Sequence, residues 1–315
     1  MENNKISKIG VLTSGGDAPG MNAAIRAVAR TAMNRGIEVF GVYRGYNGLI
    51  NGDMVQMNLR SVSDIIHRGG TMLYTARSPE FRTEEGMQKA IKTCRETGIE
   101  GVVVIGGDGS FMGARALANQ GIPCVGIPGT IDNDIACSEY TIGYDTAMNT
   151  AVEAIDKLRD TTQSHDRCSV VEVMGRHAGY LALYVGVAVG ATAVLVPEHQ
   201  YDFEKHVAEK IRAARLGGKT NFMIVVAEGA ASAMDVGKEI KEHLGLDPRV
   251  TILGHIQRGG SPSARDRETA SRMGYAAVMA LEQDKGNRII ATQDGRIVDL
   301  DMEEALAMHK DYQGK

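Results

Sequence analysis

The feature that most constrains the fold is a repeated alternation of short β-rich runs with longer amphipathic stretches. The runs are rich in Val and Ile, and most of the stretches between them have helical periodicity. Alternation of this kind predicts parallel sheets that are covered by helices on both faces. Strands are expected at 9–12, 38–43, 101–105, 124–127, 169–173, 193–196, 222–226 and 251–253, and helices at 21–35, 111–120, 145–161, 202–216, 236–244 and 264–282.

The length of the chain predicts more than one lobe. It has 315 residues, of which 43% are hydrophobic. Single cores stop growing at roughly 250–300 residues, so two lobes are expected rather than one. No linker rich in Pro or Ser divides the chain, and glycine turns suited to ligands fall in both halves. We therefore expect an α/β protein with two doubly wound, Rossmann-like lobes and the active site in the cleft between them.

Charge and cysteine usage narrow the class of partner. The formal net charge of −4 argues against a general nucleic-acid-binding surface and favours a small ligand. The N-terminus has no apolar signal segment, and the longest apolar stretch, near 181–197, is too interrupted by Gly and Thr to span a membrane. We therefore expect a cytoplasmic protein without nucleic-acid or membrane partners. Its widely spaced cysteines are typical of reduced thiols: Cys94, Cys124, Cys137 and Cys168.

A glycine-rich turn, TSGGDAPGMN at 13–22, follows the first expected strand and opens the first helix. Paired glycines let the backbone approach a ligand, and a helix N-terminus offers free amides and the positive end of a dipole to a phosphate. The spacing fits neither the G-x-G-x-x-G fingerprint nor the Walker pattern. Alone, this turn favours phosphate binding only slightly over a glycine turn that has no ligand.

A second turn of the same kind, VVVIGGDGS at 102–110, ends the run expected as a buried strand. Asp108 stands where an acid can hold Mg²⁺ directly or through water. Ser110 and the glycine amides can face phosphate oxygens. The alternative is that Asp108 only caps the following helix. Two such turns in one chain favour a nucleotide site.

The third segment, GIPGTIDND at 126–134, carries two carboxylates. Asp132 and Asp134 point to the same side if the backbone between them is extended. Phosphoryl transfer to an alcohol needs a base near the attacking hydroxyl and metal-bound charge on the nucleotide, and these two acids can divide such roles. Taken alone, the Asp-Asn-Asp segment is best interpreted as an Asx-turn that has no catalytic role.

A set of cationic residues lies beside glycine turns and strand ends. Arginine forks bind phosphate in a bidentate manner and neutralise charge on a transferring phosphoryl group. Any one of them is most simply a solvated surface charge, and His255 is most simply a core histidine. Their shared placement favours a phosphate-binding set, which comprises Arg77, Arg167, Arg176, Arg249 and Arg258.

Together these segments resemble the ATP-dependent 6-phosphofructokinase family of bacterial type. Five ordered motifs carry the resemblance over essentially the whole chain: IGVLTSGGDAPGMN, IGGDGS, PGTIDND, VEVMGRH and LGHIQRGGSP. The resemblance implies transfer of the γ-phosphoryl of ATP to the 1-hydroxyl of fructose 6-phosphate, which is the committed step of glycolysis. It also implies Mg²⁺ as metal cofactor, ATP as co-substrate and an allosteric homotetramer.

The resemblance assigns roles position by position. It places Asp132 as the catalytic base, with Thr130 and Asp134 beside it, and Arg176 as the residue that steadies the transferring phosphoryl. The implied ATP contacts are Gly16, Arg77, Ser78, Gly107, Asp108, Gly109 and Ser110, with Asp108 at the Mg²⁺ position. The implied sugar-phosphate contacts are Met174, Gly175, Glu228, His255 and Arg258 from one subunit, and Arg167 and Arg249 from a neighbouring subunit. The expected ATP-binding lobe is 1–143 with 257–304, and the expected fructose 6-phosphate-binding lobe is 144–256 with 305–315.

Two glycines bear on the choice of phosphoryl donor. Pyrophosphate-dependent relatives typically carry Asp where Gly109 stands and Lys where Gly129 stands. An Asp at 109 would repel the α-phosphate of ATP, so ATP is the expected donor and pyrophosphate is the alternative. Kinases of dinucleotides or lipids share only the second motif. A non-catalytic sugar-phosphate sensor is the most distant alternative, because it would need neither Asp108 nor Asp132.

The effector site is where the sequence departs from the family pattern. Family members bind ADP or phosphoenolpyruvate between subunits through a basic cluster, which is matched here by Arg26, Arg30, Asp64, Arg159 and Lys219. However, Leu59 stands where an arginine is usual, Thr192 where a metal-binding glutamate is usual, and Gly217 where a lysine is usual. We therefore expect activation by ADP to be weak or absent. The segment after residue 305 also looks short for the family.

Overall fold

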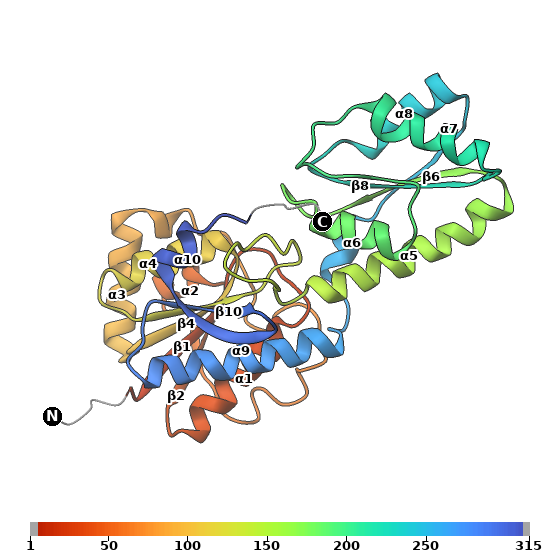
Figure 1. Ribbon diagram of the computed structural model, residues 1–315. Coiled ribbons are helices and arrows are strands. Elements are labelled where there is room, and N and C mark those ends of the chain that lie inside the picture. Colours follow the sequence, from red (N-terminus) through yellow and green to blue (C-terminus); the bar gives the residue numbers. More distant parts are fainter. Residues whose placement is uncertain (1–5, 311–315) are drawn as a thin grey trace. The chain divides into compact units, whose positions relative to one another are not determined.

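The computed structural model describes residues 6–310, which form two compact units, each built around its own sheet (Figure 1). The first unit comprises 6–130, 135–143 and 260–310, and the second comprises 131–134 and 144–259. Each unit has helices on both faces of a mainly parallel sheet, which confirms the expected doubly wound α/β class.

The unit boundaries differ from the expected lobes at three places. Residues 131–134, expected in the ATP-binding lobe, belong to the second unit. Residues 257–259 belong to the second unit, because the 3₁₀ turn Gly254–Arg258 packs against helix α5 (Tyr144–Ser164). Residues 305–310 belong to the first unit, because helix α10 (Met302–Ala307) packs against α4 (Asp108–Ala118). The remainder of the expected tail, 311–315, lies outside the described residues.

The first unit contains a seven-stranded sheet in the order β11-β10-β5-β4-β1-β2-β3. Its five central strands are parallel, and β3 and β11 are antiparallel at the two edges. The strands are β1 (Lys8–Thr13), β2 (Glu38–Val42), β3 (Met54–Gln56), β4 (Gly101–Gly106), β5 (Cys124–Pro128), β10 (Arg288–Gln293) and β11 (Arg296–Asp301).

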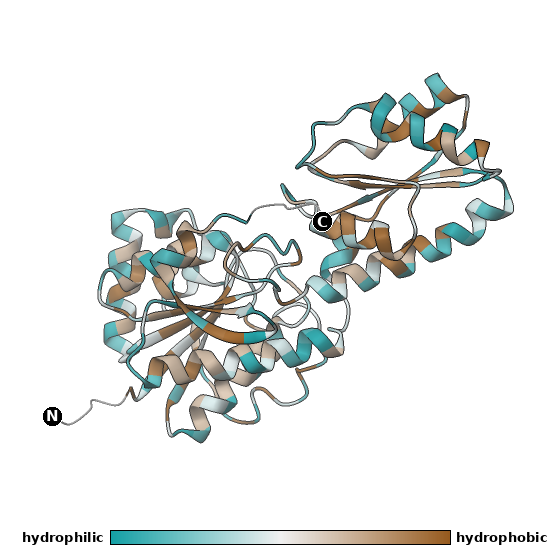
Figure 2. Ribbon diagram, in the orientation of Figure 1, coloured by the Kyte–Doolittle hydropathy of each residue, from teal (hydrophilic) through white to brown (hydrophobic). Residues whose placement is uncertain are grey.

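Helices α1 (Met21–Asn34) and α9 (Ala264–Glu282) pack together on one face of this sheet. On the other face, the apolar side chains of α4 and α10 join those of α2 (Tyr46–Asn51) and α3 (Glu84–Thr97) in one core. Val102 and Val104 of β4 point into that core, and the strand's alternation sends the side chains between them to the α1–α9 face. Figure 2 shows these strands as the apolar centre of the unit.

The second unit contains a parallel four-stranded sheet in the order β7-β8-β6-β9. Its strands are β6 (Cys168–Val173), β7 (Ala193–Leu195), β8 (Phe222–Ala227) and β9 (Arg249–Ile252). Helix α5 and helix α6 (Tyr180–Ala188) lie on one face (Figure 1). The other face packs against the π-helical segment Glu204–Ala208, α7 (Glu209–Leu216) and α8 (Ala233–Leu244).

Every strand and helix expected from the sequence is present, with ends that move by a few residues. The helix expected at 202–216 is divided into the π-helical segment and α7. The elements that the pattern did not predict are β3, β10, β11, α2, α3, α6 and α10. Between residues 6 and 310, no helix combines the length and apolar character that a bilayer crossing requires.

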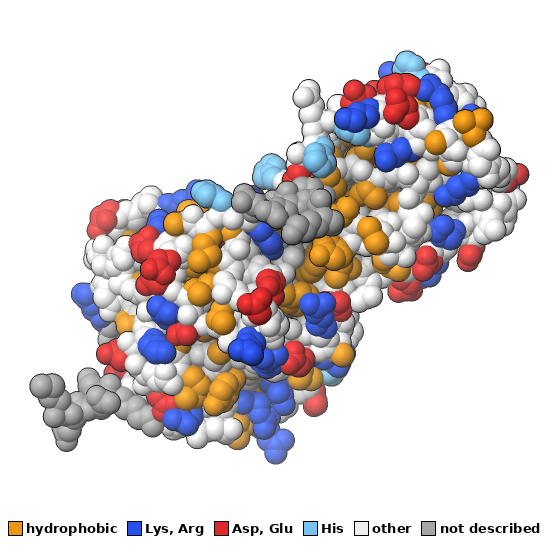
Figure 3. Space-filling view, in the orientation of Figure 1, with side chains coloured by type: hydrophobic (Ala, Val, Ile, Leu, Met, Phe, Trp, Pro, Cys, Tyr) orange, Lys and Arg blue, Asp and Glu red, His pale blue; other side chains and the backbone are white. Residues whose placement is uncertain are grey.

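The cysteines agree with the expectation of reduced thiols, and the visible surface carries charges of both signs. Side chains of Lys and Arg are interspersed with those of Asp and Glu over the face of each unit seen in Figure 3. All four cysteines are free and buried. Burial raises the pKa of Cys94 to about 11 and that of Cys168 to about 12, so these thiols stay protonated and unreactive at neutral pH.

Candidate active site

In the first unit, the glycine turns after β1 and β4 pack directly on each other. The backbone amide of Ser14 donates to the carbonyl oxygen of Ile105 at 3.0 Å. A Cβ at Gly106 would lie 2.5 Å from both the Ser14 carbonyl oxygen and the Ser110 Oγ, so no side chain fits there. Gly16 is exposed beside this contact. The two turns therefore offer their amides at one edge of the sheet, where open α/β sheets bind ligands.

Threonine side chains connect the segment before Arg77 to the first of these turns. Thr13 Oγ1 donates to the carbonyl oxygen of Tyr74 at 2.8 Å, and Thr75 Oγ1 donates to that of Gly15, also at 2.8 Å. Arg77 itself is exposed. Among the described residues, the Oγ of Ser78 is buried without a hydrogen-bond partner. A buried hydroxyl without a partner is unfavourable unless a ligand satisfies it, which fits the expected nucleotide contact.

Asp108 is the first residue of α4, and Gly107 occupies the N-cap position. The interpretation of Asp108 as the helix cap is therefore wrong. Asp108 and Gly109 are exposed, whereas Ser110 is buried. Within 6–310, no three His, Cys, Asp or Glu residues lie close enough to hold a metal by themselves. A single exposed carboxylate suits Mg²⁺, which keeps several waters and takes its other ligands from substrate phosphates.

Asp132 lies in the second unit and is 2% exposed. Burial, followed by the charge of Asp134, raises the pKa of Asp132 to about 6. Arg258 and Arg176 oppose this rise, and Glu228 adds to it. The charges that act on Asp132 thus come from its near neighbour Asp134 and from three residues that are distant in the chain, Arg176, Glu228 and Arg258. A carboxylate with this pKa is suited to accept a proton near neutral pH.

The backbone between Asp132 and Asp134 is not extended. Asn133 has a φ of 50°, in the left-handed region that Asn tolerates. The condition under which the two carboxylates would point to the same side is therefore not met, although the charge of Asp134 still acts on Asp132. Thr130, which precedes this turn, lies in the first unit, where its carbonyl oxygen accepts from Thr141 Oγ1 at 2.7 Å.

Arg176 follows β6 in a strained conformation, with φ 54°. Glu228, just after β8, holds it there: its Oε1 accepts from the amide of Gly175 at 3.2 Å and from that of Arg176 at 2.8 Å. A Cβ at Gly229 would lie 2.1 Å from the Arg176 carbonyl oxygen, so only glycine allows this approach. A left-handed arginine held by its neighbours is typical of a functional site, where strain persists because the surroundings enforce it.

Gln257 is a positioning residue that the sequence motifs did not single out. It is completely buried, and its Oε1 accepts from the backbone amide of Met174 at 2.9 Å. It thereby fixes the end of β6, from which Gly175 and Arg176 follow. Its position between His255 and Arg258 was the one available signal. Polarity alone could not separate it from an exposed glutamine.

Two of the expected sugar-phosphate contacts lie at the opposite end of the second sheet. Arg249 begins β9 and pairs in register with Ser169, and Arg167 directly precedes β6. Arg176, by contrast, follows the last residue of β6. Six strand residues span about 20 Å, so one chain does not bring Arg167 or Arg249 to its own Asp132. Arg249 is instead exposed beside Asp247, with 3.4 Å between Nη1 and Oδ2.

The expected effector residues are distributed over both units. Arg26 and Arg30 lie one turn apart on α1 of the first unit, which also contains Asp64. In the second unit, Lys219 Nζ donates to Thr192 Oγ1 at 3.2 Å, and Arg159 donates to the carbonyl oxygen of Val189. Thr192 thus presents to this lysine a neutral hydroxyl rather than a carboxylate.

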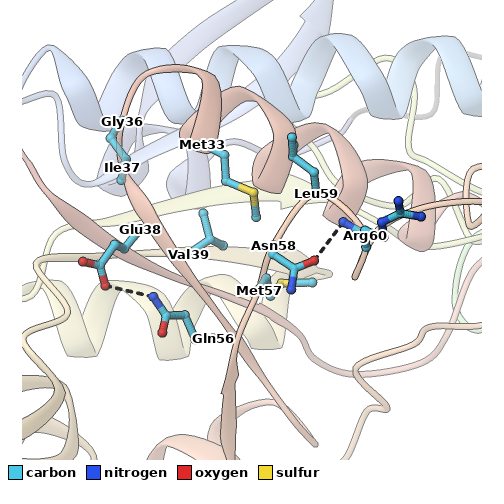
Figure 4. A pocket seen from close by; sticks show the side chains of 10 residues that line it. All are labelled: Met33, Gly36, Ile37, Glu38, Val39, Gln56, Met57, Asn58, Leu59 and Arg60. Carbon is cyan, nitrogen blue, oxygen red and sulfur yellow. Dashed lines mark hydrogen bonds between the residues drawn. The ribbon is translucent and has the colours of Figure 1, made fainter.

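Leu59 lies at a groove in the first unit between the end of α1 and the strands β2 and β3 (Figure 4). The groove has a volume of about 710 Å³, and Met33, Val39 and Met57 contribute apolar side chains to it. Leu59 is 47% exposed, and Arg60 follows it on the same rim. An apolar side chain therefore stands where the resemblance implies a cation.

Comparison with known proteins agrees with these features. The phosphofructokinase family model matches residues 8–281. The ATP-dependent 6-phosphofructokinases of Bacillus thuringiensis (strain Al Hakam) and Bacillus cereus (strain AH187) are each 58% identical over 302 residues, which cover 96% of this chain and 94% of theirs.

Solved structures agree as well. The phosphofructokinase of Saccharomyces cerevisiae superposes with a TM-score of 0.90 at 38% identity, over 95% of this chain and 45% of the yeast chain, so this chain spans less than half of that protein. A pyrophosphate-dependent phosphofructokinase from Marinobacter aquaeolei shares the fold, with a TM-score of 0.86 at 23% identity over 97% of this chain and 85% of that one. The chain belongs to the phosphofructokinase family.

Proposed function

We propose that this chain is an enzyme that transfers the γ-phosphoryl of ATP to the 1-hydroxyl of fructose 6-phosphate, giving fructose 1,6-bisphosphate and ADP. The observation that carries the proposal is the environment of Asp132, a buried carboxylate whose pKa of about 6 is set by burial and by four charged neighbours. The similarity to enzymes named ATP-dependent 6-phosphofructokinase over nearly the whole of both chains supports the same reaction.

Asp132 acts as the general base. Above pH 6 its carboxylate is mainly ionised, and it accepts the proton of the attacking hydroxyl as the oxygen forms its bond to phosphorus. Burial, and after it the charge of Asp134, keeps the pKa of that carboxyl high, while Arg258 and Arg176 keep it from rising further. The result is a base that is ionised at neutral pH and still basic enough to take a proton.

Arg176 stabilises the charge that develops on the transferring group. Its backbone is fixed by Glu228 and by the close approach of Gly229, so the side chain starts from a defined position after β6. Substitution of Glu228 would release this backbone as well as remove a sugar contact. Glu228 therefore has two roles in the proposal, one of them structural.

The glycine turns of the first unit bind the nucleotide phosphates through backbone amides and the start of α4. Asp108 would hold Mg²⁺ together with waters and phosphate oxygens. When bound, Mg²⁺ neutralises phosphate charge in the transition state. The proposal requires that a nucleotide on these turns and the sugar at Asp132 meet in the working enzyme.

Fructose 6-phosphate is bound by residues at the carboxyl end of the second sheet and by cations from a second subunit. The same-chain contacts are Met174, Gly175, Glu228, His255 and Arg258, and the partner contacts are Arg167 and Arg249. The placement of Arg167 and Arg249 at the amino end of their strands supports donation to a neighbouring copy. We accordingly propose a cytoplasmic homotetramer with shared sugar sites.

The reaction is tested by turnover of fructose 6-phosphate with ATP, GTP or pyrophosphate at one Mg²⁺ concentration. We expect turnover with ATP and not with pyrophosphate.

In Gly109→Asp we expect kcat/KM for ATP to fall by on the order of 10²-fold, because a second negative charge faces the nucleotide phosphates. Apart from its chain neighbours and the backbone of α4, no atom lies within 4 Å of a Cβ at Gly109, so the substitution fits without strain. Circular dichroism and the melting temperature serve as controls. Preferential use of pyrophosphate by the unaltered protein would instead support the alternative donor.

Activation by ADP is expected to be weak or absent. Leu59 and Thr192 replace a cation and a metal-binding acid, and Lys219 already bonds to the Thr192 hydroxyl. Saturation curves for fructose 6-phosphate with and without ADP should therefore superimpose. The paired substitution Leu59→Arg with Thr192→Glu is the matched gain-of-function variant, and it should make the half-saturating sugar concentration depend on ADP. A strong ADP response in the unaltered enzyme would contradict this expectation.

A further inference from the structure

The turn that carries Arg176 is held at both of its ends by carboxylates from other strands of the second sheet. At its start, Glu228 accepts from the amides of Gly175 and Arg176. At its end, Oε1 of Glu198 accepts from the backbone amide of Gly179 at 2.7 Å. Glu198 lies three residues after the end of β7, and the sequence motifs did not single it out. The ends of β8 and β7 therefore each supply a carboxylate to one turn.

The contact between Glu198 and Gly179 is closely packed. A Cβ at Gly179 would lie 2.5 Å from the Cβ of Val196, and closer still to Oε2 of Glu198, so only glycine fits there. Inside the turn, the amide of Ala178 donates to the first carbonyl oxygen of the turn at 2.9 Å. Because the turn is closed internally and held at both ends, its surroundings enforce the left-handed conformation of Arg176.

Glu198 also lies at the start of a helix. Gly179 is the N-cap residue of α6, which begins at the next residue. A carboxylate is stabilised at this end of a helix, because the helix dipole is positive there and the first amides have no partner within the helix. Oε2 of Glu198 is buried and has no hydrogen-bond partner among the described residues, so Oε1 makes the bond that holds the turn.

We propose that Glu198 is a positioning residue for phosphoryl transfer, which keeps Arg176 at the transferring group by fixing the far end of its turn. It acts on Gly179 and, through the turn, on Arg176, and it does not contact the substrate itself. The inference rests on the proposed function, which assigns the transferring phosphoryl group to Arg176. Glu228 holds the near end of the turn but is also assigned a sugar contact, so substitution of Glu198 tests the turn alone.

Glu198→Ala removes the acceptor at the end of the turn. We expect kcat/KM for fructose 6-phosphate to fall on the order of 10-fold, which corresponds to the loss of one hydrogen bond to a charged group. The fall should be mainly in kcat, because Arg176 is proposed to act on charge that develops in the transition state. KM for ATP should stay within about twofold of the unaltered enzyme, since the glycine turns that bind the nucleotide belong to the first unit. Steady-state kinetics with each substrate varied in turn measure both effects.

The pH profile separates a positioning role from a loss of stability. The charge of Arg176 lowers the pKa of Asp132, so release of the turn in Glu198→Ala should move the acidic limb of kcat/KM to higher pH. The other charges that act on Asp132 are retained in the variant: Asp134, Arg258 and Glu228. A variant that is only less stable would lose activity by the same factor across this limb.

Two further variants separate the acceptor from the charge and from general stability. In Glu198→Gln the amide oxygen can still accept from Gly179, and the change at Oε2 breaks no bond, so most of the lost kcat/KM should be recovered. Glu172→Ala is the matched control, because Oε2 of Glu172 accepts at 2.9 Å from the amide of Ala233, at the start of α8 in the same unit. That variant should lower the melting temperature and leave kcat/KM unchanged.

An unchanged kcat/KM in Glu198→Ala, an acidic limb that does not move, or an equal loss in Glu172→Ala would overturn the inference. If Glu198→Ala does not fold, Glu198→Asp shortens the side chain by one methylene and keeps its charge, and it should show the same loss and the same shift of the limb. Failure of the proposed function is distinguishable, because the unaltered protein would then show no turnover of ATP with fructose 6-phosphate.

Discussion

Asp132→Ser is expected to lower kcat by on the order of 10²–10⁴-fold, which is the usual contribution of a positioned general base. Serine removes the only proton acceptor that the proposal assigns to the sugar hydroxyl and leaves Arg176 and Arg258 in place. Steady-state turnover with ATP measures the loss. Calorimetric binding of fructose 6-phosphate is the control, because the loss of the base should spare most of the sugar-phosphate contacts. Turnover equal to that of the unaltered enzyme would refute the assignment.

The pH dependence and the stability of the same variant report on the carboxylate itself. Because the pKa of Asp132 is about 6, the activity of the unaltered enzyme should fall as pH drops through 6. This fall should be missing from the residual activity of the variant.

The effect of the ionised carboxylate on folding stability is opposite to its effect on activity. The folded state binds the proton more tightly than the unfolded state, whose pKa is near 3.8, so the carboxylate lowers stability as pH rises through this window. Asp132→Ser should therefore raise the free energy of unfolding at neutral and higher pH, by roughly 1–3 kcal/mol. A lower melting temperature under those conditions would contradict the burial argument.

Mixing Asp132→Ser subunits with Arg249→Ala subunits is expected to restore activity that neither variant has alone. In the proposed oligomer, Asp132 comes from one chain and Arg249 from its neighbour. A chain that carries Asp132→Ser can still donate its Arg249 to a chain whose Asp132 is intact. Random assembly of equal amounts leaves about one quarter of the sites with both native residues. Co-expression with two affinity tags, followed by tandem purification and assay, measures the restored fraction.

The control for this experiment is a mixture of Asp132→Ser with Arg176→Ala. Both positions belong to the same chain's site, as the effect of Arg176 on the pKa of Asp132 shows. Every site in that mixture therefore carries one of the two substitutions, and activity should stay at the level of the parents. Equal behaviour of the two mixtures would contradict donation of Arg249 between subunits.

The sequence predicted the strands that are rich in Val and Ile and the helices that cover them. It missed strands that are polar and most of the short helices. The hairpin of β10 and β11 carries charged and polar residues in both strands, and its Asp294-Gly295 turn was the available signal. Helix α3 has a Thr83 N-cap and buries Met87 and Ile91, a pattern that was equally readable. Helix α6 is apolar around most of its surface, so periodicity could not separate it from a buried strand.

The candidate site shows the same division. Motifs identified Asp132 and Arg176, because glycine turns follow strand ends there, and the family resemblance added Glu228. The sequence could not show that Glu228 uses Oε1 to hold two backbone amides, or that Asn133 turns the chain between two acids. Gln257 acts through a buried hydrogen bond to the backbone amide of Met174. Hydrogen-bond partners of this kind depend on which distant segments come together in the folded chain, and a local sequence pattern does not predict that.

The interrupted course of the first unit has a consequence for synthesis of the protein. Its core includes Ile289, Ala291 and Met302, which are translated after the whole of the second unit. The ribosome therefore releases a complete set of second-unit residues while the larger sheet still lacks β10 and β11. During that interval the strand β5 has an open edge, which is a site for pairing with other nascent chains. Slow translation between residues 260 and 290 would lengthen the time for which this edge is exposed. Holdase chaperones would bind at the open edge of β5.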